Sequence, residues 1–192
     1  DYARAAAMAM GRAMDEVVID AALGNAFTGV SGGTTVAGQT AIANNSTGLT
    51  LAKLLAAKET LDGDDVPEDG RVIVCTADQV SDLLNTTEIK SSDFNTVKAL
   101  ARGELDTFLG FRFIPVNGKR IDGTKLVPVD GSSHRRCFAF QNEGLLLGVG
   151  ADMNTKISER ADKNYATQVF CSMTIGGTRM EEARVLEILC VE

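Results

Sequence analysis

The chain has 192 residues and carries 19 lysine and arginine side chains against 26 aspartate and glutamate side chains, a formal net charge of −7. This length suits one large or two small domains. The acidic balance argues against sequence-independent nucleic-acid binding as the main function, because such binding needs a basic face. No apolar run approaches the roughly 20 residues that a membrane-spanning helix requires.

The first predicted element is a long helix over Asp1–Leu23. Its apolar side chains recur at helical spacing, with the charged side chains largely on the other side. The apolar set is Ala3, Ala6, Ala7, Met10, Met14, Val17, Val18, Ala21 and Ala22. Alanine and methionine favour helix, and only Gly11 weakens it. Because the sequence starts inside this helix, we expect the natural product to begin earlier.

A loop is predicted over Gly24–Gly48, where glycines alternate with threonine, serine, alanine and asparagine. This segment is too long for an ordinary connection, so we expect either a mobile functional segment or one that a neighbour orders. A phosphate-binding loop would need a lysine followed by serine or threonine directly after its second glycine, and the first lysine of the chain is Lys53. The phosphate-loop interpretation is therefore rejected.

The middle of the chain, Leu49–Gly150, predicts a compact α+β unit. The acidic turn Asp62–Gly70 resembles the start of a calcium loop, but Pro67 stands where that loop requires glycine, so a solvated turn is expected. The continuous apolar run in Arg71–Cys75 is typical of a strand buried on both faces. The other predicted elements are helices over Thr50–Leu61, after the capping box Thr76–Gln79 and over Asp93–Arg102, and strands over Phe108–Val116, Lys125–Val129 and Arg136–Gln141.

The last forty residues carry the clearest period-two pattern. Met153–Arg160 alternates between apolar and polar residues, which predicts a half-buried strand. Gly144–Gly150 leads into it, Gly176-Gly177 is expected to end the next strand, and Arg184–Val191 predicts a third. In the middle strand the residues that share one face are Val169, Cys171, Met173 and Ile175.

These strands would form a long, narrow ribbon of roughly 26–36 Å, at about 3.3 Å per residue. A ribbon of two or three strands is marginal alone and needs a cover for its apolar face. The helix at the opposite end of the chain, roughly 33 Å long, is the expected cover. The chain ends, residues 1–48 and 151–192, would then form one discontinuous unit beside a central unit of residues 49–150.

No catalytic, cofactor-binding or metal-binding residue is predicted. His134, the one histidine, lacks the nucleophile elbow of a Ser-His pair. Gly148–Gly150 fails as a dinucleotide loop because a strand is expected after it. Glu181 and Glu182 would point to opposite faces of a strand and could not share a metal or a proton. Buried reduced thiols are expected at Cys75, Cys137, Cys171 and Cys190.

Several short runs are similar to sequences of one known family. They are Phe94–Leu100, Gly103–Phe111, Arg160–Val169, Met173–Gly176 and Thr178–Glu182, with weaker similarity at Leu51–Leu54 and Asp65–Pro67. Together they resemble the major capsid proteins of tailed bacteriophages and prophages over nearly the whole chain. The resemblance implies the HK97-like capsid fold, an α+β fold. Its peripheral domain has a spine helix and a long β ribbon, and its axial domain mixes helices and sheet.

The resemblance also implies the function: a structural, non-enzymatic subunit that self-assembles into the icosahedral head of a tailed phage or prophage around double-stranded DNA. Homo-oligomers are expected as pentamers and hexamers, with scaffolding and portal proteins as further partners, non-specific contact with packaged DNA, and no membrane. The expected location is the virion capsid, after assembly in the bacterial host cytoplasm. The alternatives are an encapsulin-like cargo shell, a small α+β ligand-binding or enzymatic domain with a deep pocket, and an adhesin-type module.

A shell subunit needs complementary faces rather than an active site. Charged residues near the predicted ribbon ends are candidates for contacts between neighbouring subunits, and a solvated hairpin tip is the alternative. These residues are Arg160, Asp162, Lys163 and Arg179. The acidic balance is expected to keep the inner wall from adhering to packaged DNA.

Overall fold

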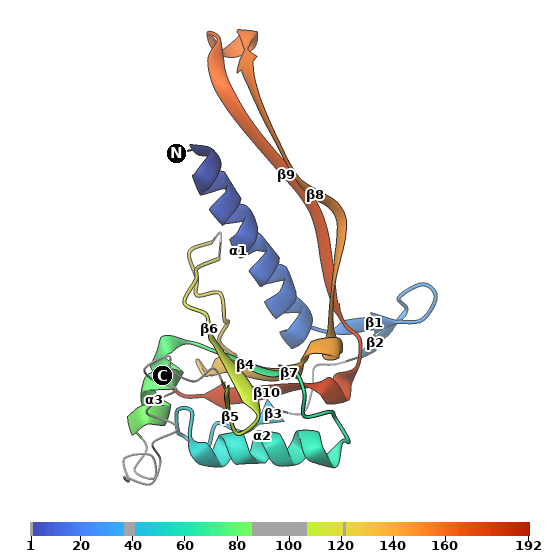
Figure 1. The fold of residues 1–192 in the computed structure, drawn as a ribbon, viewed down its shortest axis with the longest axis vertical. Helices are drawn as coiled ribbons and strands as arrows, with labels where there is room; N and C mark the ends of the chain where they lie inside the picture. Colours follow the sequence, from blue (N-terminus) through green and yellow to red (C-terminus); the bar gives the residue numbers. More distant parts are fainter. Residues whose placement is uncertain (1, 37–40, 86–106, 121) are drawn as a thin grey trace.

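The structure is a computed structural model of the chain and describes residues 2–36, 41–85, 107–120 and 122–192 (Figure 1). The helix predicted over Asp93–Arg102 and the run Phe94–Leu100 lie outside the described residues. The helices are α1 (Tyr2–Leu23), α2 (Leu51–Gly63) and α3 (Ala77–Asn85). The strands are β1 (Ala26–Thr28), β2 (Thr34–Val36), β3 (Ala41–Ile42), β4 (Arg71–Cys75), β5 (Thr107–Phe108), β6 (Phe111–Pro115), β7 (Arg135–Gln141), β8 (Leu145–Arg160), β9 (Ala166–Arg179) and β10 (Val185–Cys190).

The body of the molecule is a mixed six-stranded sheet in the order β3-β10-β7-β4-β6-β5. β7 pairs antiparallel with β10 and β4, whereas β4–β6 and β3–β10 are parallel pairs. α2 and α3 cover one face, and the C-terminal end of α1 covers the other. All five residues of β4 are buried, which confirms the predicted strand with two buried faces.

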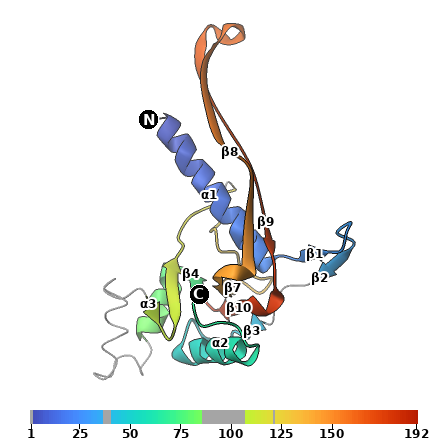
Figure 2. The ribbon, with the colours of Figure 1, turned by 45° about the vertical axis from the view of Figure 1, so that its right-hand side comes forward.

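α1 and the β8–β9 ribbon rise from the same side of the sheet (Figures 1 and 2). The ribbon strands pair antiparallel from Leu145–Arg179 at the base to Arg160–Ala166 at the tip. α1 contacts β9 along the lower part of the ribbon, and the two separate toward the N-terminal end of the helix. The predicted contact between the N-terminal helix and the ribbon is therefore confirmed for the lower part of the ribbon.

β9 carries the predicted period-two pattern. Val169, Cys171, Met173 and Ile175 are half-buried, and the residues between them from Phe170 to Thr174 are exposed. The prediction that Gly176-Gly177 ends the strand is wrong, because β9 continues to Arg179. A Cβ at Gly177 would lie 3.1 Å from the Ala21 Cβ and 3.2 Å from Val17. The glycine thus lets the helix approach the strand closely.

The third predicted ribbon strand lies elsewhere. β10 pairs with β7 and β3 in the body, so the ribbon has two strands. Val185 packs in the core under α1, whereas Leu186 and Ile188 pack in the core under α2. A strand that is apolar on both faces needs a cover on each side, and only the body sheet supplies two.

Three further predictions need correction. The loop predicted over Gly24–Gly48 contains the β1–β2 hairpin and the short strand β3. The strand predicted over Phe108–Val116 is a hairpin, because Leu109 (φ 54°) and Gly110 (φ 82°) turn the chain between β5 and β6. Lys125–Val129 forms no strand and makes only the isolated bridges Lys119–Lys125 and Val129–Arg135.

The locally encoded elements match their predictions. α2 starts after Thr50, whose side chain accepts a hydrogen bond from the Lys53 amide. The capping box before α3 forms, with the Thr76 amide donating to Gln79 Oε1 at 3.2 Å. Among the described residues, no helix combines the length and the apolarity needed to cross a membrane.

Candidate interaction surfaces

The face of the ribbon beside α1 is only half covered. α1 packs mainly on β9, and beyond Leu145 the residues of β8 paired with that face are exposed. We call Leu147, Val149 and Ile157 the β8 strip, because each pairs with a β9 residue of the α1 side and lies on the same face. Ile157 is 66% exposed. These exposed aliphatic side chains make this face of the ribbon a candidate interaction surface.

The prediction that Met153–Arg160 is half-buried is therefore wrong, since every residue of this segment is exposed. The physical reason is the direction of α1, which separates from the ribbon as the ribbon extends away from the body (Figures 1 and 2). A space of about 440 Å³, lined by Tyr2, Ala6, Thr167 and Val169, lies between the first turns of α1 and β9.

Arg179 lies at the base of the ribbon and is buried, not at an exposed end as predicted. Its Nη1 donates to the Ala22 carbonyl at 3.1 Å and to the Gly24 carbonyl at 2.9 Å, and Nη2 donates to the Val36 carbonyl at 3.4 Å. The guanidinium therefore joins α1, the β1–β2 hairpin and β9 within one chain. A contact between subunits through this side chain is not available.

The C-terminal end of α1 receives its cations from elsewhere in the fold. α1 has no basic residue in its last turn, but Arg136 Nη2 donates to the Leu23 carbonyl at 3.0 Å, beside Arg179. Arg136 is held in turn by Glu187, with Nε and Oε1 2.5 Å apart. Helix carbonyls without intrahelical partners are thereby satisfied, and the positive charges face the negative end of the helix dipole.

The ribbon tip carries the other predicted charged residues. Arg160 Nε donates to Asp162 Oδ1 at 2.9 Å, and this hydrogen bond lowers the pKa of the Asp162 carboxyl. Asn164 and Tyr165 turn the chain with left-handed φ values of 52° and 57°. Arg160, Asp162 and Lys163 are exposed there, and their contact with neighbouring subunits stays a prediction.

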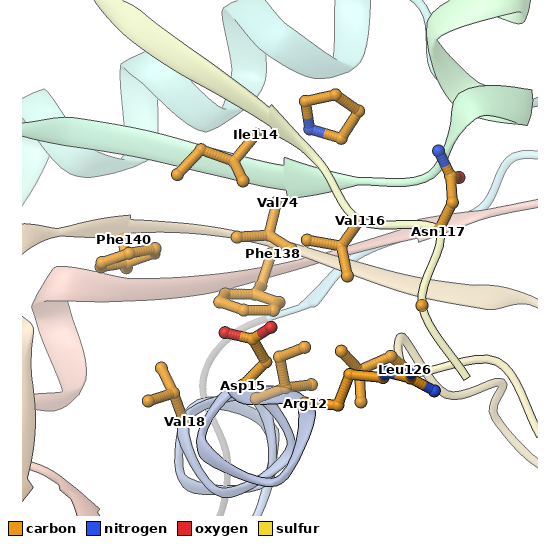
Figure 3. A pocket seen from close by; sticks show the side chains of 13 residues that line it. Arg12, Asp15, Val18, Val74, Ile114, Val116, Asn117, Leu126, Phe138 and Phe140 are labelled. Atoms are coloured by element: carbon orange, nitrogen blue, oxygen red, sulfur yellow. The ribbon is translucent and has the colours of Figure 1, made fainter. Parts of the chain in front are cut away.

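A second surface is a groove of about 470 Å³ between α1 and the body sheet (Figure 3). Its walls are mainly apolar side chains from the helix, the sheet and the segment after β6. Arg12 and Asp15 of α1 supply its charged groups. The apolar lining includes Val18, Val74, Ile114, Val116, Leu126, Phe138 and Phe140.

The residues rejected as catalytic candidates have structural partners. His134 Nδ1 lies 2.9 Å from Asp130 Oδ2, and Nε2 lies 3.0 Å from the Asn44 amide nitrogen. The His134 backbone amide donates to Asp130, which with the side-chain contact lowers the pKa of that carboxyl. Glu181 Oε2 accepts from Arg184 Nε at 2.5 Å, whereas Glu182 lies 3.8 Å from Arg179 Nε. Gly148–Gly150 lies inside β8, which begins at Leu145, earlier than the strand expected from Met153.

Three of the four cysteines are buried free thiols on neighbouring strands, and Cys171 is half-buried rather than buried as predicted. Burial raises the pKa of Cys75 to about 12. A hydrogen bond with Cys190, together with burial, raises the pKa of Cys137. Among the described residues, no group of three or more His, Cys, Asp and Glu side chains is arranged to hold a metal ion.

Solved structures similar to this chain include phage capsids and a virus-like particle. A Mycobacterium phage Che8 structure matches with a TM-score of 0.68 and 16% identity, over 97% of this chain and 61% of that one. The capsid of cyanophage P-SCSP1u gives a TM-score of 0.66 and 16% identity, over 100% of this chain and 65% of that one. A virus-like particle from Pyrococcus furiosus gives 0.54 and 12% identity, over 92% and 61%.

These likenesses confirm the predicted α+β HK97-like capsid fold. The chain spans about 61% to 65% of the length of these shell proteins. A search of curated proteins gives no match. The model of the phage capsid protein family matches residues 1–192 and confirms the resemblance seen in the short runs. The chain belongs to the phage capsid protein family.

Proposed function

We propose that this chain is the shell-forming part of a major capsid protein, which assembles into the icosahedral head of a tailed phage or prophage around double-stranded DNA. The observation that carries the proposal is the unfinished ribbon. Two strands of 16 and 14 residues extend from the body, and α1 contacts β9 and the base of β8 but leaves most of both strands uncovered. Two-stranded ribbons are marginal in water, and their open edges are ready to pair or pack with another chain.

The proposal includes a division of labour within the chain. α1, the β1–β2 hairpin and the ribbon form the peripheral domain, and residues 49–150 form most of the axial domain. Strand pairing supports adding β3 and β10 to the axial domain, because both lie in the body sheet. This changes the boundaries expected from sequence, residues 1–48 and 151–192, while keeping a discontinuous peripheral unit.

The proposed role is structural and non-enzymatic. Pentamers and hexamers of this chain would build the shell, with scaffolding and portal proteins as further partners. Assembly would occur in the bacterial host cytoplasm, and the finished protein would reside in the virion. The net charge of −7 supports a weak, non-specific relation to packaged DNA rather than tight binding.

Expression of the full-length protein in a bacterial host, followed by electron microscopy, tests the proposal. Wild type should form closed shells or rings. Ile157→Asp, which places a charge on the β8 strip, should shift the protein toward small oligomers or monomers. Ser158→Asp adds the same charge to the opposite face of the same strand and is the matched control. A wild-type protein that stays monomeric at all concentrations would contradict the proposal.

A cargo shell on the same fold is a second candidate, because one similar structure, from Pyrococcus furiosus, is a virus-like particle rather than a phage capsid. The contents of purified particles separate the two candidates. Particles made during phage induction should contain double-stranded DNA if the protein builds a phage head. Particles that instead enclose a folded enzyme would favour the cargo shell.

A further inference from the structure

The β1–β2 hairpin is built unlike an ordinary solvent-exposed loop. It forms a two-stranded sheet of its own and projects from the body beside the base of the ribbon (Figures 1 and 2). Phe27 is 67% exposed, and Val30 at the tip is fully exposed. The sequence from Ala21 to Ala52 contains no charged residue. Exposed hairpins are normally protected by charges, so this one is suited to contact with an apolar surface.

The hairpin is also held in a fixed position. Gly29 and Gly32 adopt φ values of 89° and 63°, so they shape the tip where other residues would be strained. Arg179 donates hydrogen bonds both to the Val36 carbonyl of the hairpin and to the Ala22 carbonyl at the end of α1. An apolar tip with a preset direction loses little freedom when it binds.

The α1–sheet groove has the matching chemistry. It offers about 470 Å³ lined mainly by valine, leucine, isoleucine and phenylalanine side chains (Figure 3). Pockets of roughly 300–1,000 Å³ accept groups of several carbon atoms, so the groove has room for the side chains of Phe27 and Val30. None of the residues that line it belongs to the hairpin. The hairpin of the same chain therefore does not fill it.

We propose that the β1–β2 hairpin of one copy inserts Phe27 and Val30 into the α1–sheet groove of a second copy. The inference rests on the proposed shell function, because an assembling chain meets many copies of itself. The two surfaces are different patches of the molecule, so the contact is heterologous. Each copy can then give its hairpin to one neighbour and receive a hairpin from another, an arrangement that forms a ring when the rotation between copies closes.

Disulfide trapping in assembled full-length protein tests this contact. The double variant Val30→Cys, Ile114→Cys places one thiol at the tip and one in the groove, where Ile114 is 38% exposed. Mild oxidation with diamide should give a ladder of covalent multimers on a non-reducing gel. Each single variant should run as a monomer on the same non-reducing gel, which also controls for disulfides formed by the native cysteines. A ladder is expected because a heterologous contact links each copy to two neighbours.

Three results would overturn the inference. Shells that form normally without the ladder remove the contact and leave the proposed function intact. A covalent dimer from Val30→Cys alone would mean that hairpin tips meet each other instead. A ladder from the double variant Tyr165→Cys, Ile114→Cys would mean that the ribbon tip of a neighbouring copy, rather than its hairpin, occupies the groove. If wild type forms no shell or ring at any concentration, the proposed function itself is wrong, and the hairpin contact that rests on it falls with it.

A second variant keeps the test independent of trapping. Val30→Asp should lower particle yield at least tenfold. The melting temperature of the unassembled chain should stay the same, because Val30 is fully exposed to solvent in the single chain. Thr34→Asp adds the same charge on the hairpin face opposite Phe27, since Phe27 pairs with Thr35. An unchanged yield with Val30→Asp would contradict the inference.

Discussion

The body sheet and the ribbon use the same kind of strand in opposite ways. In β4 every residue is buried, and apolar side chains pack against helices on both faces. In β8 the aliphatic residues of the β8 strip face solvent, and the segment from Ala151 to Arg160 has no buried residue. The body is therefore completed within one chain, whereas the ribbon leaves apolar side chains exposed, which under the proposed function neighbouring copies would cover.

The sharpest test of this comparison replaces a residue of the same type, phenylalanine, by alanine in each of the two regions. Phe138 is fully buried in the body, and Phe170 is 51% exposed on the ribbon. Phe138→Ala should lower the free energy of unfolding of the unassembled chain by about 3–5 kcal/mol, through lost transfer energy and the cavity left behind. Phe170→Ala should change it by less than about 0.5 kcal/mol. Urea unfolding measures both, and equal losses would erase the distinction.

The junction between the regions gives the next largest effect. Arg179→Met removes a buried cation that serves carbonyls of α1 and the β1–β2 hairpin, so we expect a loss of about 2–4 kcal/mol. Arg160→Met at the exposed ribbon tip is the control and should leave the unfolding curve nearly unchanged. If both variants unfold like wild type, Arg179 does not hold the junction.

A smaller effect is expected where α1 meets β9. A Cβ at Gly177 would press on Ala21 and Val17, whereas a Cβ at Gly176 would meet nothing within 4 Å. Gly177→Ala should therefore lower the free energy of unfolding by about 1 kcal/mol through overpacking. Gly176→Ala should have no such cost. Thermal unfolding of the two variants compares them, and a stabilised Gly177→Ala would mean that α1 is not closely packed there.

The smallest effect concerns pH and the edge of the body. Hydrogen bonds from Arg135 lower the pKa of Glu192 to about 2 from its ordinary 4.5. A carboxyl with a depressed folded pKa stabilises above its unfolded pKa, and that stabilisation is lost as the pH falls from about 4.5 toward about 2. Wild type should thus exceed Glu192→Gln in urea stability at neutral pH, with the gap closing in this window. A constant gap would contradict the pairing.

Elements set by local signals were predictable from sequence. The helical spacing of Tyr2–Leu23, the caps at Thr50 and Thr76, and the alternation in β9 each depend on residues close in the chain. The fold itself followed from the resemblance together with the pairing of helix and ribbon.

The errors came from distant contacts. β10 was predicted as a ribbon strand, but it lies in the body sheet, where its two apolar faces pack against the cores on both sides of the sheet. Arg179 was predicted at an exposed strand end. In the structure it is buried, and its guanidinium donates to the carbonyls of Ala22, Gly24 and Val36. The exposed β8 strip was missed because alternation predicts an apolar face, and does not say which chain covers it.

Hydrogen exchange of the backbone amides tests the central claim most directly, because it reports on each region in the same sample. In the unassembled full-length protein, amides of β4 should exchange slowly and those of β8 rapidly. In purified particles the β8 amides should become strongly protected, while those of β4 change little. A ribbon that is protected equally before and after assembly would contradict the claim that neighbouring copies complete it.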